Sequence, residues 1–115
     1  DSIMEYLQID NRGDLKRKEE ILCSLYKKLE SCAETFKNTT YKKLYDDTKL
    51  LFNKSGVRHN VEKDSIACAT FLTMDKEELE KWYDIIFDMF LSCMEIYKYL
   101  SNKSDIDNIK KGICT

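Results

Sequence analysis

A chain of 115 residues with 43% hydrophobic and 35% charged residues has the size and composition of one folded domain, which excludes intrinsic disorder. Its net charge of −2 gives no electrostatic reason to expect a nucleic-acid partner. No apolar run approaches the roughly 18 residues that cross a bilayer, so we expect no transmembrane segment.

Helices are the elements that the sequence favours, because it has no proline and only three glycines. Apolar residues recur at spacings of three and four, which is typical of amphipathic helices. The pattern predicts helices over residues 3–9, 14–37, 40–55, 61–72, 75–100 and 104–113. We expect Asp14, Thr40, Asp75 and Ser104 to cap four of them, with Gly56 as a stop signal.

Together these helices predict an all-α fold. We expect an antiparallel four-helix-type bundle of two long and two short helices, with short extra helices at both termini. Because neither a repeat nor a change of composition divides the chain, residues 1–115 are predicted to form a single domain.

The five cysteines are dense for a reducing compartment. If the turns near residues 39 and 74 lie at one end of the bundle, Cys32 and Cys68 are at similar heights along their helices. We therefore predict a Cys32–Cys68 disulfide. A second bridge would use two of Cys23, Cys93 and Cys114. The alternative is that all five are reduced core residues.

Three Asn-x-Ser/Thr sequons fall at predicted helix junctions, at Asn38, Asn53 and Asn102. We predict these asparagines as glycosylation positions. Like the disulfides, they favour a secreted or extracellular location over the alternative, the cytoplasm.

Candidate partner contacts begin at Arg12-Gly13-Asp14, which spells an integrin-recognition tripeptide in a predicted turn. The alternative is an ordinary helix start, in which Gly13 turns the chain and Asp14 caps the helix. Further positive charge comes from Lys16, Arg17 and Lys18, together with Lys27, Lys28, Lys42 and Lys43. We interpret it as ordinary solvated surface, and the alternative is a basic face that attracts an acidic protein or a sulfated glycan.

Two further surface features lie on the helix predicted over residues 75–100. Tyr99 lies off its apolar stripe and is a candidate exposed contact, as is Tyr6 near the start of the chain. Acidic residues gather near its start, at Asp75, Glu77, Glu78, Glu80 and Asp84. We interpret these carboxylates as ordinary solvated surface.

Catalytic chemistry has little support in the sequence. His59 is the single histidine, and no Cys-x-x-Cys pair or glycine-rich phosphate loop accompanies it. We therefore expect no enzyme activity, no metal site and no cofactor.

The leading prediction is a secreted or cell-surface helical module, stapled by disulfides, that binds another protein in a receptor, adhesion or host-interaction role. One alternative is an intracellular helical adaptor or regulatory subunit with reduced cysteines. Another is a small carrier that holds an apolar ligand between its helices. The sequence does not identify the partner.

Overall fold

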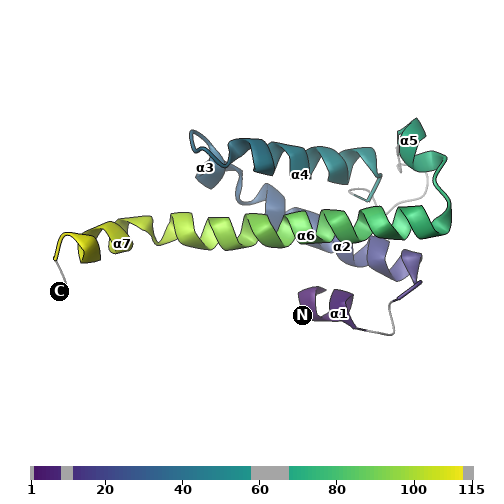
Figure 1. Ribbon diagram of the computed structural model, residues 1–115, viewed down its shortest axis with the longest axis horizontal. Helices are drawn as coiled ribbons and strands as arrows, with labels where there is room; N and C mark the ends of the chain where they lie inside the picture. Colours follow the sequence, from purple (N-terminus) through teal and green to yellow (C-terminus); the bar gives the residue numbers. More distant parts are fainter. Residues whose placement is uncertain (1, 9–11, 58–67, 113–115) are drawn as a thin grey trace.

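The computed structural model describes residues 2–8, 12–57 and 68–112, and all regular structure in these ranges is helical. The helices are α1 (Ser2–Leu7), α2 (Leu15–Glu30), α3 (Ala33–Phe36), α4 (Lys42–Lys54), α5 (Ala69–Leu72), α6 (Lys76–Ser101) and α7 (Lys103–Lys110) (Figure 1). This confirms the predicted all-α helical bundle with short helices at both termini.

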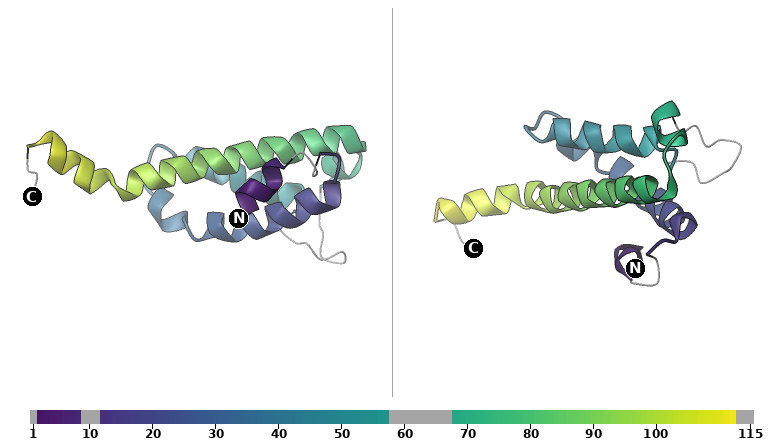
Figure 2. Two further views of the ribbon diagram at one scale, coloured as in Figure 1. Left: turned by 90° about the horizontal axis from the view of Figure 1, so that it is seen from below. Right: turned by 45° about the vertical axis from the view of Figure 1, so that its right-hand side comes forward.

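The body of the bundle consists of α2, α4 and α6, and α4 runs antiparallel to both of the others (Figure 1). The short α1 lies against α2, and α3 packs on α4 and α6. Helix α7 continues beyond the body, which gives the molecule a length of 55 Å against 30 and 21 Å in the other directions (Figure 2). None of the described helices is both long and apolar enough to cross a membrane.

Two helix starts follow the predicted capping. The Asp14 side chain accepts a hydrogen bond from the backbone N–H of Arg17, at 3.0 Å. Asp75 does the same for Glu78, at 2.8 Å. Each carboxylate satisfies a donor that a helix N-terminus leaves open, so these residues fix where α2 and α6 begin.

The long helix predicted over residues 14–37 is interrupted between α2 and α3. There the Ser31 hydroxyl and the Cys32 thiol both donate to the carbonyl oxygen of Lys28, at 2.6 and 3.2 Å. Side chains that bond back to a carbonyl in this way compete with the helical ladder. Asn38 then adopts a left-handed conformation, with φ of 65°, and the chain reverses into α4.

Other predicted boundaries differ by a few residues. Helix α4 begins after Tyr41 and not after Thr40, and α7 begins after Asn102 and not after Ser104. Of the helix predicted over 61–72, only the end is described, and it forms α5. Residues 61–67 lie outside the described ranges.

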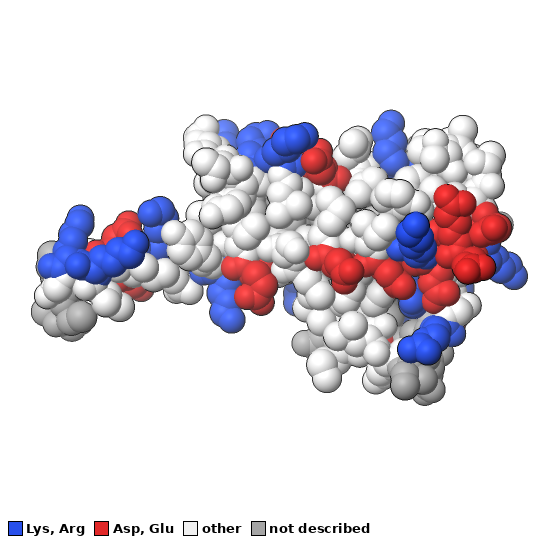
Figure 3. Space-filling view, in the orientation of Figure 1, with Lys and Arg blue, Asp and Glu red and all other residues white. Residues whose placement is uncertain are grey.

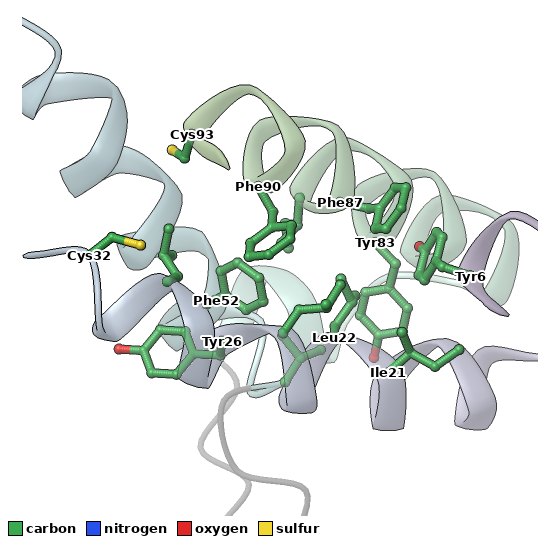
Figure 4. Close-up of a cluster of buried hydrophobic side chains, with 14 of the residues drawn as sticks. Tyr6, Ile21, Leu22, Tyr26, Cys32, Phe52, Tyr83, Phe87, Phe90 and Cys93 are labelled. Atoms are coloured by element: carbon green, nitrogen blue, oxygen red, sulfur yellow. The ribbon is translucent and has the colours of Figure 1, made fainter. Parts of the chain in front are cut away.

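Aromatic side chains fill the centre of the bundle. Phe52 from α4 and Phe90 from α6 are fully buried, and their ring centres lie 6.5 Å apart in an edge-to-face arrangement (Figure 4). Tyr26 from α2 contacts Phe52, with ring centres 5.2 Å apart. Each buried side chain of this size contributes about 1.5–3 kcal/mol through the hydrophobic effect. These contacts therefore hold the three main helices together.

The predicted Cys32–Cys68 disulfide is wrong. Cys32 directly precedes α3 and lies near Tyr45 in the first turn of α4. The backbone N–H of Cys68 instead donates to the carbonyl of Lys54 at the other end of α4, at 2.8 Å. A helix of 13 residues is about 20 Å long, and a disulfide needs Cα atoms within about 7 Å. The turns near residues 39 and 74 lie at opposite ends of the bundle (Figure 1), so the assumption behind the height comparison fails.

The other described cysteines are free thiols as well. Cys23 lies half-buried on α2, and Cys93 is buried with its sulfur 3.5 Å from the hydroxyl of Thr48. Cys114 lies outside the described residues. Among the residues that the structure describes, no disulfide forms, and this contradicts the predicted disulfide-stapled, secreted module.

Candidate partner-binding groove

An open groove of about 580 Å³ lies between α1 and the first half of α6. One side carries apolar side chains of α1, and the other carries charged side chains of α6. The groove is lined by Tyr6, Leu7, Gln8, Arg12, Lys18, Glu77, Glu80, Lys81, Asp84, Phe87 and Asp88. Figure 3 shows carboxylates gathered along α6, with the uncharged surface of α1 below them.

A buried lysine lies beneath this groove. The side chain of Lys18, from α2, is only 7% exposed, and its Nζ lies 2.9 Å from Glu80 Oε2 and 2.9 Å from Asp84 Oδ1. The Tyr6 hydroxyl donates to the same Asp84 oxygen at 2.7 Å. Lys18 Nζ also lies 5.1 Å from the centre of the Tyr6 ring, within the range of a cation–π contact. One charged network thus joins α1, α2 and α6.

Further contacts hold α1 in place as one wall of the groove. The Tyr6 ring stacks on Phe87 of α6, with centres 4.0 Å apart and planes 10° from parallel. Glu5 forms an ion pair with Arg17 of α2. The predicted exposure of Tyr6 is wrong, because only 5% of its surface is exposed. Tyr6 is both an apolar anchor and a hydrogen-bond donor for α1.

The chain between α1 and α2 is fixed to α6 as well. The backbone N–H of Gly13 donates to Glu80 Oε2 at 2.7 Å, and Gly13 adopts a φ of 84° that other residues rarely adopt. Gly13 and Asp14 thus serve the fold, as the alternative to integrin recognition expects.

These contacts shift the pKa values of three groups. Burial, and then the hydrogen bond to Asp84, raise the pKa of Tyr6. Burial lowers the pKa of Lys18, but hydrogen bonds to Asp84 and Glu80 outweigh it and leave the pKa above its ordinary value. The hydrogen bonds from Lys18 and from the Gly13 N–H lower the pKa of Glu80. At neutral pH Lys18 and Glu80 are therefore both charged.

The lowered pKa of Glu80 makes the stability depend on pH. A carboxylate whose pKa is lowered in the folded state stabilises the fold fully above its unfolded pKa of 4.5. This stabilisation is lost as the pH falls from 4.5 through the lower pKa of the folded state. We expect the free energy of unfolding, measured in urea, to fall less below pH 4.5 in Glu80→Gln than in the unchanged chain. Glu95→Gln, on an exposed part of α6, should keep the original pH dependence. If the free energy of unfolding fell equally with pH in all three proteins, the assigned role of Glu80 would be contradicted.

The predicted partner contacts are distributed over several places. Arg12 is exposed and lines the groove, whereas Lys18 is buried beneath it, so Lys18 belongs to the interior and not to a basic face. Lys16 is exposed, and Arg17 pairs with Glu5. Tyr99 is 44% exposed near the other end of α6. Of the predicted partner contacts, only Arg12 and Lys18 line the groove.

The predicted glycosylation asparagines differ in exposure. Asn38 is exposed in its turn, and Asn53 is half-buried on α4. Asn102 is exposed, but its side-chain nitrogen donates to the carbonyl oxygen of Lys98 at 2.9 Å. Glycosylation at these positions stays a prediction.

Metal ligands do not converge within the described part of the chain, where no three His, Cys, Asp or Glu side chains are placed to share an ion. His59 lies outside the described residues. In comparisons with protein-family models, curated proteins and solved structures, no match to this chain was found.

Proposed function

We propose that this domain is a non-catalytic protein-binding module whose groove between α1 and α6 receives a cationic segment of another protein. The observation that carries the proposal is the pairing of open carboxylates with an apolar wall in one groove. Glu77 and Asp88 line it without an ion pair to any described residue, and Leu7 faces solvent with 63% of its surface exposed.

The exposure and hydrogen bonding of the Asp84 side chain support a cationic ligand. Its side chain is half-exposed, and Lys18 and Tyr6 both bind the single oxygen Oδ1. Its second oxygen, Oδ2, accepts no hydrogen bond from the residues that the structure describes, so it is available to a partner at the groove. A lysine or arginine side chain has an apolar stem and a cationic head. The stem suits the wall at Leu7, and the head suits Asp84 and Asp88.

The charge around the groove favours the same ligand. Asp75, which caps α6, and the first half of this helix as far as Asp88 together carry six carboxylates against two lysines. Arg12, Lys18 and Lys81 also line the groove, so it offers both signs. On the wall formed by α6, however, four carboxylates stand against Lys81 alone. Such an excess speeds the approach of an oppositely charged partner and makes binding sensitive to salt.

This function agrees with one of the alternatives that the sequence left open, a helical adaptor with reduced cysteines in a compartment such as the cytoplasm. The free thiols of Cys23, Cys32, Cys68 and Cys93 support it. The other alternative, a carrier of an apolar ligand, has less support, because aromatic rings occupy the centre of the bundle and the groove has charged walls.

Peptide binding tests the proposed function. An amphipathic peptide of leucine and lysine should bind in a calorimetric titration, and the same peptide with glutamate in place of lysine should not. Asp88→Lys should weaken binding about tenfold or more, because it places a like charge where the cation sits, and about 1.4 kcal/mol is enough for that factor.

Glu95→Lys is the matched control, since it makes the same charge change on the same helix outside the groove lining. It should bind like the unchanged chain. Absence of binding, or an equal loss in both variants, would refute the groove as the binding site.

A further inference from the structure

Among the helices that the structure describes, α7 alone has no buried residue. Its Ile109 exposes 63% of its surface. It extends past the ends of the neighbouring helices (Figures 1 and 2), and its packing is mainly against the end of α6. Because none of its residues is buried, α7 lacks the tertiary packing that stabilises most helices. A helix of eight residues is only marginally stable in water without such packing.

The end of α7 carries the chemistry that the groove favours. Ile106 and Ile109 are three residues apart and share a face. Lys110 and Lys111 follow, and both are exposed and form no ion pair with the described residues. The third cation, Lys103, is already paired with Asp107 at 3.4 Å. The segment 109–111 therefore presents one apolar side chain followed by two available cations.

We propose that the end of α7 in one copy of this chain occupies the groove between α1 and α6 of a second copy. The inference rests on the proposed function, because it names an occupant of the same groove. Ile109 would pack on the exposed Leu7, and Lys110 and Lys111 would pair with Asp84 and Asp88. The match is between opposite charges and between exposed apolar side chains.

The two surfaces cannot meet within one copy. Asp88 is the last residue of α6 that lines the groove, and α7 begins at Lys103, so about 15 residues of α6 and its end separate them by roughly 22 Å. The helix between them keeps α7 directed away from the groove (Figure 1). A contact between two different surfaces is head-to-tail, so it can continue from copy to copy.

Sedimentation velocity of the full chain tests this inference. At low salt the average sedimentation coefficient should rise with protein concentration, and high salt should reverse the rise. Asp88→Lys, and the double variant Lys110→Glu with Lys111→Glu, should each weaken association about tenfold or more. Glu95→Lys should associate like the unchanged chain.

Mixing the two defective proteins gives the decisive readout. The Asp88→Lys protein keeps a functional α7, and the double variant keeps a functional groove, so an equimolar mixture should form dimers and nothing larger. The inference would be overturned if the unchanged chain stayed monomeric at every concentration. It would also be overturned if the Asp88→Lys protein and the double variant each associated as strongly as the unchanged chain. If the leucine–lysine peptide binds a chain that stays monomeric, the proposal that a second copy occupies the groove is refuted, and the proposed function stands. If the peptide fails to bind, both proposals fall.

Discussion

Replacing Phe90 with alanine is expected to lower the free energy of unfolding by about 3–5 kcal/mol, which is in the upper range for a single substitution. The ring is fully buried between α4 and α6 and contacts Phe52. Its removal loses the transfer free energy of the side chain and leaves a cavity that rigid neighbouring helices cannot close. Urea unfolding monitored by circular dichroism measures the change.

Leu72→Ala provides the control for this prediction. Leu72, on α5, exposes 71% of its surface, so its truncation should change the free energy of unfolding by no more than about 0.5 kcal/mol. Similar effects at the two positions would show that Phe90 does not lie at the centre of the core.

Lys18→Met should lower the free energy of unfolding by about 2–3 kcal/mol, even though methionine has a similar shape and is more hydrophobic. The substitution removes the shared cation of Glu80 and Asp84 and leaves two neighbouring carboxylates without it. Hydrogen bonds to charged groups contribute about 1.5–3 kcal/mol each, and we take less than the sum of two because Asp84 is half-exposed.

Lys27→Met, at an exposed position of the same helix, removes the same charge without breaking the network. Its effect should stay within about 0.5 kcal/mol. If Lys18→Met were as stable as the unchanged chain, the ion pairs of Lys18 would contribute nothing to stability. Helix α1 would then be held by the contacts of Tyr6 and by the Glu5–Arg17 ion pair.

Local signals in the sequence were enough to predict most helices. Asp14 and Asp75 are capping residues whose effect depends only on the first turn of their helix, and the apolar period of α6 continues over its whole length. The break before α3 was missed because Cys32 and Phe36 continue the apolar stripe of α2. Hydrogen bonds from Ser31 and Cys32 to Lys28 interrupt the helix without changing that period.

The directions of the helices could not be predicted in the same way. Periodicity shows which face of a helix is buried, but not at which end of the bundle the chain turns. The disulfide prediction depended on the turns near residues 39 and 74 lying together. They lie apart, and Cys32 and Cys68 are separated with them.

Only part of the groove could be predicted from the sequence. Lys18 stands three residues before Ile21 and four before Leu22, on the apolar face of α2, and this position could have predicted its burial. The acidic start of α6 was recognised but interpreted as solvated surface. The contact of Tyr6 with Phe87 and Asp84 joins residues about 80 positions apart, and no local pattern reports it.

The central claim is that a cationic segment binds between α1 and α6. Chemical-shift mapping of the backbone amides during titration with the leucine–lysine peptide tests it most directly. The account predicts shifts at residues 6–8 and 77–88, with little change along α4. Shifts centred on α4, or spread evenly over the surface, would contradict it.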